Sequence, residues 1–579
     1  MAPTVTITTG DKACELLRDS DFERQWAYLL AVCPWATPYQ SRDFVCTWFT
    51  HYRLGYEPIV VTATGPDRAL RGLLLLGRQH AGKRLVVAGA HQAEYQCWLS
   101  LPDEHVGTLE AMVAALTREF PGTDIHFKYL PSAFPVAELL RSPLISGRAE
   151  VRSHRRPLMR LLRAEVEESF QKKSNRSRFN RLSRIGEVTF RRIRDAEQFA
   201  QCFDDVATYY DFRQGAANAS LPFATDPQKR PFHLDLLRNN PDLLHVTVMW
   251  LAGKPLAAHL GIVGKREVHL AILGHSPFLA RHSPGKLHLM MLSRQLIEEG
   301  LDCLDLTPGG LWKERFANDH DEVWELMLHS SQTTKRRSQA QSLAIAGSRS
   351  LAATFGLQPA AARRLLKSLG RLRLASVSRK LQRTLYEKVE FRVYRHTVTS
   401  AATRVDPVPV RCDDLCDLLK FRPAERWHET QAFLSAALQR IERGEHVYTL
   451  ADDHKLLHYG WLIDDQTHAC FIEVQQGFEF PEHSAVLYDF YTDPDERGRG
   501  LYQRTIQCII QDALQRIEGL RYVYISVLAD NRPSRHVIEK LGFDYQCSLF
   551  LNRRFGRVTL SRSDGSVLKC PQQVGRNDE

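Results

Sequence analysis

Hydrophobic and polar positions along the chain switch between two periods, and this switching predicts a mixed α/β protein. Residues 58–64 and 70–78 have the composition of a strand pair, whereas residues 108–120 have the apolar spacing of an amphipathic helix. Residues 166–185 predict another helix, and residues 244–273 predict a β-hairpin. Helices and strands continue to alternate beyond the hairpin, so we expect α/β architecture throughout the chain.

The last third of the chain shows the same alternation. In order, the predicted elements are a strand pair (446–464), two strands (468–476 and 484–492), a helix (501–517), a strand (521–528) and a helix (533–541). A proline and two glycines before the first of these helices favour a loop there. The part of the chain that contains the predicted hairpin shares this order of elements, although no sequence repeat is visible.

A chain of 579 residues exceeds the length that one hydrophobic core usually organises, so several domains are expected. The expected segments are a first fold copy (1–150), a second copy (151–332), a basic helical linker (333–404), a C-terminal domain (405–562) and a flexible tail (563–579). The linker is predicted from residues 331–400, which contain fifteen Lys and Arg against two Glu, interleaved with apolar residues.

The composition excludes a broadly disordered chain, because 44% of the residues are hydrophobic and 25% are charged. The N-terminus lacks a basic start followed by an apolar core, and no segment reaches the ~18 apolar residues of a spanning helix. We therefore expect a cytoplasmic protein, with peripheral attachment to the inner face of the membrane as an alternative. The net charge of +10 suits several anionic partners. Residues 335–395 would contact an anionic membrane surface, and nucleic acid is the less favoured partner.

The 12 cysteines are scattered, and we expect them to be reduced, mostly buried thiols. Cys412 and Cys416 lie closest together in the sequence, but they have neither Cys-x-x-Cys spacing nor a nearby histidine. No metal site is therefore predicted.

The loop at residues 497–502 carries the clearest chemical signal. Its sequence, Arg-Gly-Arg-Gly-Leu-Tyr, follows a predicted strand and begins a predicted helix. Glycines allow positive φ angles and a close approach of the backbone to a ligand, and the N-terminus of a helix favours negative charge. Such a loop can hold a pyrophosphate on backbone N–H groups without a metal ion.

Two motifs in this region point to a family. YTDPDERGRGLYQ resembles motif A of the GNAT superfamily of acyltransferases, and NRPSRHVIEKLGF resembles motif B, which lines the pantetheine arm of acyl-CoA. The resemblance implies an acyl-CoA cofactor, in the simplest case acetyl-CoA. The cofactor-binding residues that it implies are Arg497, Gly498, Arg499, Gly500, Leu501, Tyr502, Asn531 and Ser534.

The catalytic residues of this region are less clearly marked. In many GNAT proteins a tyrosine just before the Glu-Lys-x-Gly-Phe run protonates the leaving thiolate, but this chain has Ile538 there. Another acid, a water molecule or an inactive site would account for that difference. The candidate acids are Ser534, Tyr491 and Tyr502, and the candidate bases are Glu473 and Asp489, predicted on strands beside the loop. Each of these can equally be a surface or hydrogen-bonded strand residue.

The run HSPGKLHLMMLSRQLIEEGLDCLDLTPGGLWKERFAN resembles the CelD-like acetyltransferases, which are related to the FemAB-like double-GNAT proteins. Trp312 stands where that family usually has a tyrosine. The segments PWATPYQSRDFVCTWFTHY, GAHQAEYQCWL and SFQKKSNRSRFNRLSRIGEVTF extend the resemblance over residues 20–330. It implies a second cofactor-binding turn at Ser283, Gly285 and Lys286.

Three further features of the N-terminal half have two interpretations each. Arginines recur every third residue over 178–184 and form either a solvated helix face or a stripe that binds acyl-CoA, a sugar nucleotide or tRNA. His259 lies in the predicted hairpin and is either a core histidine or a general base. Asp305 and Lys313 form either a structural pair that closes the fold or part of a site.

The resemblances together imply tandem GNAT folds: a degenerate copy, a second copy, a basic helical linker and a C-terminal GNAT domain. The implied function is acyl transfer from acyl-CoA to an amino or hydroxyl group. The CelD-like resemblance implies a small-molecule or polysaccharide-precursor acceptor in envelope or exopolysaccharide synthesis. Two alternatives stay open: a FemAB-like aminoacyl transferase that uses charged tRNA, and a non-catalytic N-terminal docking module with only the C-terminal domain active.

Overall fold

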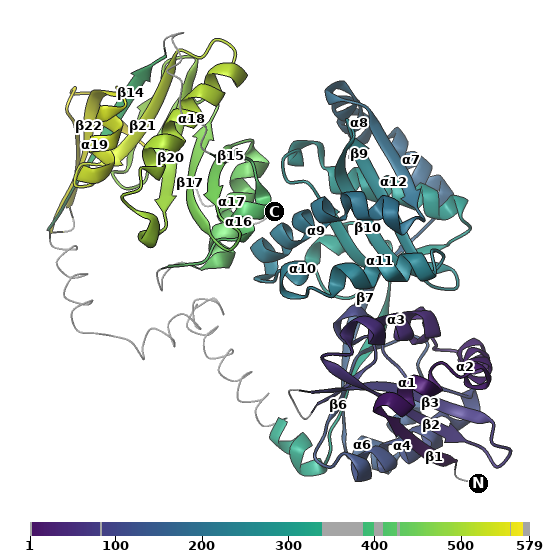
Figure 1. Ribbon diagram of the computed structural model, residues 1–579. Helices are drawn as coiled ribbons and strands as arrows, with labels where there is room; N and C mark the ends of the chain where they lie inside the picture. The colour runs from purple at the N-terminus through teal and green to yellow at the C-terminus, as the bar shows by residue number, and fades with distance from the viewer. Residues whose placement is uncertain are drawn as a thin grey trace. The chain divides into compact units, whose positions relative to one another are not determined.

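The chain folds into two compact units, each with its own large β-sheet (Figure 1). The computed structural model describes residues 3–80, 84–338, 386–398, 409–424, 429–555 and 557–570. The first unit takes in residues 1–210, 221–276 and 282–351, and the second takes in residues 211–220, 277–281 and 352–579. The expected α/β architecture is therefore present in both units.

A sheet of 13 strands forms the first unit. The strand order is β1-β2-β3-β4-β6-β13-β7-β12-β11-β10-β9-β8, with β5 beside β3. The strands are β1 (Thr4–Thr9), β2 (Tyr56–Thr64), β3 (Leu70–Gln79), β4 (Leu85–Val87), β5 (Leu99–Ser100), β6 (Ile125–Leu130), β7 (Ala149–Arg160), β8 (Val188–Ile193), β9 (Leu244–Leu251), β10 (Lys254–Val263), β11 (Glu267–His275), β12 (Cys303–Asp305) and β13 (Asp319–Leu328). The predicted hairpin at 244–273 is the antiparallel meander β9–β10–β11.

The long strands β7 and β13 join the two expected fold copies. β13 pairs with β7 along its whole length, from Asp319 opposite Leu158 to Leu328 opposite Ala149. Its other edge pairs with β6 of the first copy. Residues 1–150 and 151–332 are thus built on one continuous sheet, because the last strand of the second copy completes the sheet of the first.

Helices pack on both halves of this sheet. They are α1 (Gly10–Leu16), α2 (Ser20–Val32), α3 (Arg42–Tyr52), α4 (His105–Glu119), α5 (Val136–Leu139), α6 (Pro143–Ser146), α7 (Arg163–Gln171), α8 (Lys173–Ile185), α9 (Ala196–Asn218), α10 (Pro222–Thr225), α11 (Lys229–Asn239) and α12 (Pro284–Glu298). One hydrophobic cluster contains Trp48 and Phe127 of the first copy together with Phe199 and Val246 of the second. The helix predicted over 166–185 is broken at Lys172, whose ψ of 122° is not helical.

The second unit contains an eight-stranded sheet and a three-stranded sheet. The order of the larger sheet is β15-β16-β17-β20-β21-β14-β22-β23, and that of the smaller sheet is β18-β19-β24. The strands are β14 (Tyr386–Thr397), β15 (Arg411–Cys412), β16 (His446–Ala451), β17 (Leu456–Ile463), β18 (His468–Phe471), β19 (Gln476–Glu479), β20 (Ser484–Thr492), β21 (Tyr522–Leu528), β22 (Asp544–Arg554), β23 (Arg557–Arg562) and β24 (Leu568–Lys569). The helices are α16 (Leu415–Leu419), α17 (Thr430–Arg443), α18 (Leu501–Arg516) and α19 (Arg532–Lys540).

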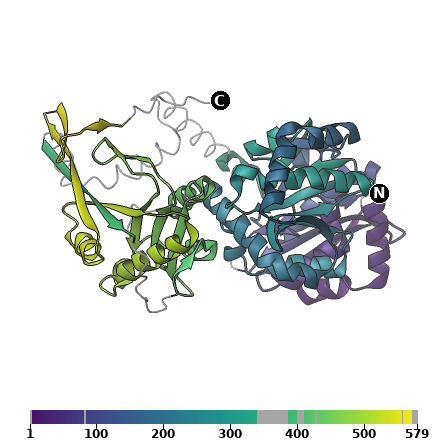
Figure 2. The same cartoon turned by 90° about the horizontal axis from the view of Figure 1, so that it is seen from above.

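The two faces of the larger sheet are covered differently. Helices α18 and α19 lie on one face, where Ile506 and Ile538 pack with Leu487 of β20 (Figures 1 and 2). Phe478 of the small sheet packs with Val486 of β20 in a separate cluster. Val486 and Leu487 are neighbours on β20 but belong to two different hydrophobic cores, because successive side chains of a strand point to opposite faces of the sheet.

Strand β14 corrects the expected linker. The segment 333–404 was expected to be helical and the C-terminal domain to begin at 405, but β14 lies inside that segment and pairs with both β21 and β22. Its apolar residues Val389, Phe391 and Val393 alternate with charged ones, so the helical interpretation missed a strand period within a basic segment. Residues 339–385, on which most of the expected membrane contact falls, lie outside the described residues.

The structure also corrects two further expectations, a flexible tail over residues 563–579 and reduced thiols for all the cysteines. Strand β24 lies within residues 563–579, and Cys570 after it forms a disulfide with Cys470 of β18. These two cysteines are 100 residues apart in the sequence, so no local pattern pairs them. Among the described helices, none is both long and apolar enough to cross a bilayer.

Candidate functional site

A pair of diverging strands forms the centre of the second unit. β20 and β21 run parallel and pair from Ser484 opposite Tyr522 to Leu487 opposite Ile525. Both strands continue beyond this point, to Thr492 and Leu528, but the ladder between them ends. The chain then leaves β20 through the loop at 497–500 and enters α18.

The loop presents backbone rather than side chains to its surroundings. Gly498 has a φ of 81° and Gly500 a φ of 74°, the left-handed region that glycine adopts without strain. A Cβ atom at either glycine would meet nothing within 4 Å, so the space above the loop is open. Gly500 is the N-cap of α18 and supplies no side-chain cap, which leaves the first N–H groups of this helix for a ligand.

The loop arginines differ in their contacts. Arg499 donates to Glu496 at 2.6 Å, and Glu496 also lies 3.3 Å from Lys455. Arg497 is exposed, and the helix that begins at Leu501 adds the positive end of its dipole. The arrangement is suited to an anion of the size of a pyrophosphate.

A bulge interrupts β20 just before the loop. Tyr488 and Tyr491 lie opposite Trp461 and Tyr459 of β17, so two residues of β20 face a single residue of β17 and β20 has one extra residue. The first of them, Asp489, has a φ of 48°. A Cβ atom at Gly460 of β17 would lie 2.2 Å from the Phe490 ring, so this glycine makes room for the bulge. Asp489 and Phe490 have no ladder partner in β17, and unpaired backbone N–H groups of this kind can bind a carbonyl oxygen.

Two hydroxyl groups meet beside the loop. Ser534 of α19 donates to the Tyr502 hydroxyl at 2.9 Å, and the Asn531 side chain caps α19 by accepting from the Ser534 N–H. Burial raises the pKa of Tyr502 to about 12. Tyr502 therefore stays protonated at neutral pH and can act as a hydrogen-bond donor.

His458 of β17 lies near this pair. Its ring is 6.2 Å from that of Tyr502 and 6.1 Å from that of Phe490, measured between centroids. Nδ1 lies 2.8 Å from the Thr492 hydroxyl, and Nε2 has no hydrogen-bond partner among the described residues. Burial lowers the pKa of His458 to about 3, so the imidazole is neutral at physiological pH.

The first unit contains a cavity of about 400 Å³. Both expected fold copies line it. The first contributes Trp35 and Tyr95, and the second contributes Arg156 of β7 together with Lys265, Glu267 and His269. A cavity of this size accepts a small-molecule ligand.

Asp305 organises the wall of this cavity. Its carboxylate is fully buried at the end of β12 and accepts from Tyr95 at 2.5 Å, Arg156 at 3.2 Å and the Thr307 N–H at 2.7 Å; Nδ1 of His269 lies 2.9 Å away. Burial raises the pKa of Asp305, but the hydrogen bond and charge of His269 and the charge of Arg156 hold it below its usual range. The carboxylate is therefore ionised, and it orients the His269 ring.

The other nitrogen of His269, Nε2, lies 3.7 Å from Glu267. An imidazole held by a buried carboxylate at one nitrogen can take a proton from a ligand at the other. This wall of the cavity can therefore act as a general base toward a bound amine or hydroxyl group.

The turn before α12 gathers positive charge. Ser283 is the N-cap of this helix with a φ of 53°, and a Cβ atom at Gly285 would lie 3.0 Å from the His275 ring. Burial lowers the pKa of Lys286, and the positive charges of Arg178 and Lys172 lower it further. The turn thus brings cations of α8 to the start of α12, but Gly285 is packed against a ring and does not open toward solvent like the glycines of the C-terminal loop.

Family comparisons match both of these regions. The family described as acetyltransferase (GNAT) domain matches residues 169–341, and the family described as acetyltransferase (GNAT) family matches residues 413–543. The chain carries two GNAT domains. The C-terminal GNAT domain contains the loop and the hydroxyl pair, and the N-terminal GNAT domain contains α12, His269 and Asp305.

Similar solved structures have low sequence identity. FemX is 10% identical, covers 52% of this chain and 95% of its own, and gives a TM-score of 0.36. L-PGS from Bacillus licheniformis is 12% identical, covers 54% of this chain and 92% of its own, and gives a TM-score of 0.35. The tandem GNAT protein from the clavulanic acid biosynthesis pathway is 14% identical, covers 64% of this chain and 99% of its own, and gives a TM-score of 0.23. No curated protein matches the chain. At these values none of the similarities bears on the substrate.

The candidate catalytic residues of the C-terminal GNAT domain separate in space. Ser534 meets Tyr502, as described, whereas Asp489 is paired with Arg440 of α17. Tyr491 stacks on Tyr459, with ring centroids 5.5 Å apart. The interpretation of Glu473 as a residue of a strand beside the loop is wrong, because it is exposed in the turn between β18 and β19 of the small sheet.

Ile538 is completely buried in the core beneath α19. The position that usually supplies a tyrosine acid in the family therefore presents no polar atom here. Tyr502 and Ser534 are the two hydroxyls that meet beside the loop, and of these Tyr502 lies on another element, α18.

His259 and Lys313 of the N-terminal GNAT domain lie outside the cavity. His259 is fully buried beside His245, with ring centroids 5.7 Å apart, and burial lowers its pKa well below the usual range. It does not line the cavity. Lys313 donates to Thr307 rather than to Asp305, and burial lowers its pKa to about 8. The direct Asp305–Lys313 pair considered from the sequence is therefore not formed.

Sequence reasoning missed His269, Tyr95 and Arg156 as site residues. Tyr95 and Asp305 are 210 positions apart, so their contact follows from the shared sheet and not from any local spacing. The sequence signals for this site were the CelD-like resemblance of the segment GAHQAEYQCWL, which contains Tyr95, and that of the run that contains Asp305.

A third cluster corrects the expectation that Cys412 has no histidine near it. His446 lies beside Cys412 and Asp413 in the structure, and the pKa of His446 is raised to about 11 by hydrogen bonds to Asp413, Asp464 and Cys412. The antiparallel pairing of β15 with β16 brings these residues together.

Proposed function

We propose that the protein is an acetyl-CoA-dependent acyltransferase whose C-terminal GNAT domain binds the cofactor. The observation that carries this proposal is the open loop at 497–500. Its two glycines have positive φ angles and free space above them, and it leads into an uncapped helix N-terminus beside two diverging strands. Arg497, Arg499, Leu501 and Tyr502 would flank the pyrophosphate, and Asn531 and Ser534 the pantetheine arm.

Acetyl-CoA would supply an activated acyl group as a thioester. The backbone N–H groups of the β20 bulge would hold the thioester carbonyl while an amine or hydroxyl of the acceptor attacks its carbon. A new C–N or C–O bond forms, the C–S bond breaks, and the acceptor loses a proton. Tyr502, whose oxygen already accepts from Ser534, would donate its own proton toward the departing sulfur.

We infer that the cavity of the N-terminal GNAT domain takes a small acceptor with an amine or hydroxyl group. His269, oriented by Asp305, would accept the proton from that group. The resemblance to CelD-like proteins supports an amino sugar or a polysaccharide precursor as the acceptor, in envelope or exopolysaccharide synthesis. The cations at the start of α12 support a second anionic group there, either that of acyl-CoA or that of an activated sugar.

Titration calorimetry of acetyl-CoA into the full-length protein tests the cofactor proposal. Gly500→Glu places a negative charge where the pyrophosphate would lie, and we expect it to weaken binding at least tenfold. Gly253→Glu is the matched control, because Gly253 also has a positive φ of 79° and nothing within 4 Å, but lies in the β9–β10 turn of the other unit. Equal binding by wild type and Gly500→Glu would refute the proposed site.

The number of sites in the same titration decides whether the N-terminal GNAT domain binds the cofactor too. Binding of two equivalents, one of which is lost in Lys286→Glu, would support a second acyl-CoA site. A single equivalent would leave the N-terminal domain without an acyl-CoA site. Salt-sensitive binding of tRNA that Lys286→Glu weakens would instead favour aminoacyl transfer.

A further inference from the structure

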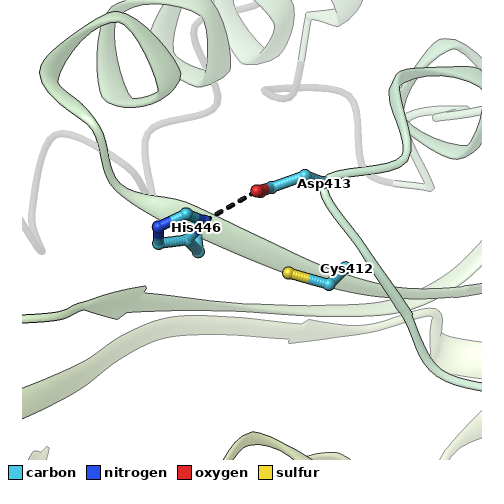
Figure 3. Close-up of side chains that lie close together, drawn as sticks. All are labelled: Cys412, Asp413 and His446. Carbon is cyan, nitrogen blue, oxygen red and sulfur yellow. Dashed lines mark hydrogen bonds and ion pairs between the residues drawn. The ribbon is translucent and has the colours of Figure 1, made fainter. Parts of the chain in front are cut away.

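Three side chains that can each bind a metal lie together at one edge of the C-terminal sheet, away from the sites described above. Cys412 ends β15, Asp413 follows it, and His446 begins β16 (Figure 3). One ligand atom from each lies within 4.8 Å of the others. Within the part of the chain that the structure describes, no other group of His, Cys, Asp and Glu meets this condition.

The backbone holds these side chains in place. The Asp413 N–H donates to the Val447 carbonyl at 2.8 Å, and the Val447 N–H donates to Oδ1 of Asp413 at 3.0 Å. Oδ2 of Asp413 lies 2.6 Å from Nδ1 of His446, as the dashed line in Figure 3 shows. Cys412 is exposed and points into the same space, so an ion can reach the cluster from solvent.

The distances fit a small cation after a modest contraction. Around a tetrahedral Zn²⁺ with bonds of about 2.0–2.3 Å, neighbouring ligand atoms lie roughly 3.3–3.8 Å apart. The longest separation in the cluster has to close by about 1 Å, which Cys412 can supply by rotation because its side chain is exposed. Oδ2 of Asp413 and Nδ1 of His446, now 2.6 Å apart, have to separate by roughly 0.7 Å as the hydrogen bond between them is lost.

A further carboxylate lies next to the cluster. Oδ2 of Asp464 is 3.4 Å from Nε2 of His446, and Oδ1 of Asp464 is buried without a hydrogen-bond partner among the described residues. Arg516 offsets part of this charge through its pair with Asp464. The two carboxylates still place negative charge on both sides of a single imidazole, which favours a divalent cation.

We propose that Cys412, Asp413 and His446 form a zinc-binding site that links β15 to β16. A thiolate together with an imidazole selects Zn²⁺ over Mg²⁺ or Ca²⁺, which prefer oxygen ligands. Three protein ligands and an exposed position leave a fourth place for water or for Asp464. On binding, the Cys412 thiol and the His446 imidazolium each lose a proton to solvent, and the ion gains the sulfur and a ring nitrogen as ligands.

Titration of Co²⁺ into the reduced full-length protein tests this site, because a Co²⁺–thiolate bond gives a charge-transfer absorption that oxygen ligands do not give. We expect one equivalent of Co²⁺ to produce the band and Zn²⁺ to displace it. Cys412→Ser should abolish the band, and His446→Gln and Asp413→Asn should weaken binding at least tenfold. Cys14→Ser and His454→Gln are the matched controls and should bind as wild type does.

Either of two results would overturn the proposal: no thiolate band in wild type, or a band of the same strength in Cys412→Ser. Because Cys412 is exposed, its serine variant is expected to fold, and acetyl-CoA titration of the same sample provides a separate check. The Gly500→Glu variant should keep the Co²⁺ band. Failure of the zinc site and failure of the cofactor site are therefore distinguishable.

Discussion

Replacing Asp305 by asparagine should strongly destabilise the first unit. Asp305 accepts from Tyr95 and Arg156 and faces Nδ1 of His269 through Oδ2, and it accepts from the Thr307 N–H through Oδ1. Asparagine has one acceptor oxygen, so in either orientation its NH₂ group meets at least one of these donors.

The cost can be worked from these contacts. Orienting the amide oxygen toward Tyr95, Arg156 and His269 sacrifices the buried Thr307 N–H, which costs about 1–3 kcal/mol, and removes the charge that strengthens the other bonds. Arg156 keeps its pair with Asp321, so its charge is not left unpaired. We expect a total loss of about 2–4 kcal/mol, below the 3–5 kcal/mol that an unpaired buried charge costs, because Arg156 keeps a partner.

Urea unfolding followed by tryptophan fluorescence measures this loss, because most of the tryptophans lie in the first unit. The midpoint should fall by on the order of 1 M relative to wild type. Asp302→Asn is the matched control, since Asp302 lies on the surface and pairs only with the exposed Arg266 among the described residues. A midpoint within about 0.3 M of wild type for Asp305→Asn would contradict the reasoning.

The same variant has a defined pH dependence. The folded-state pKa of Asp305 is depressed, so its contribution to stability is present above the carboxyl's unfolded pKa and is lost as the pH falls through the folded one. The difference between wild type and Asp305→Asn should therefore shrink on acidification. A difference that stays constant down to strongly acid pH would mean that the carboxylate charge does not contribute.

Three further predictions concern other parts of the structure. Gly460→Ala forces the Phe490 ring away from β17 and should weaken acetyl-CoA binding through the bulge, as calorimetry would show, while Gly107→Ala, in open space and without a positive φ, should not. Burial raises the pKa of Glu299, but hydrogen bonds from His245 and Gln295 and the Arg192 charge lower it to about 2. The contribution of Glu299 to the free energy of unfolding should therefore be complete above the ordinary glutamate pKa of 4.5 and fade as the pH falls toward 2. The Glu299→Gln variant should not show this loss of stability when it is titrated with acid. Ile538→Tyr should lower stability by about 1–3 kcal/mol through overpacking and give no gain in acyl transfer, which thermal unfolding and a thiol-release assay would check.

The sequence alone determined those features that depend on neighbouring residues. The loop from Arg497 to Tyr502 could be recognised because turn, phosphate contact and helix start are all properties of one short segment. The meander at 244–273 and the helix from Leu501 followed from apolar spacing in the same way. The GNAT resemblance of both regions rested on such segments.

Other features depended on contacts between distant segments, and these only the tertiary structure decided. β14 joins the C-terminal sheet, β13 completes the sheet of the first copy, and Cys470 bonds to Cys570. The Asp305 cluster and the Cys412 cluster unite residues from strands that are adjacent only after folding. The spacing of residues within one strand fixes which face they share, but it does not specify which other strand lies beside them.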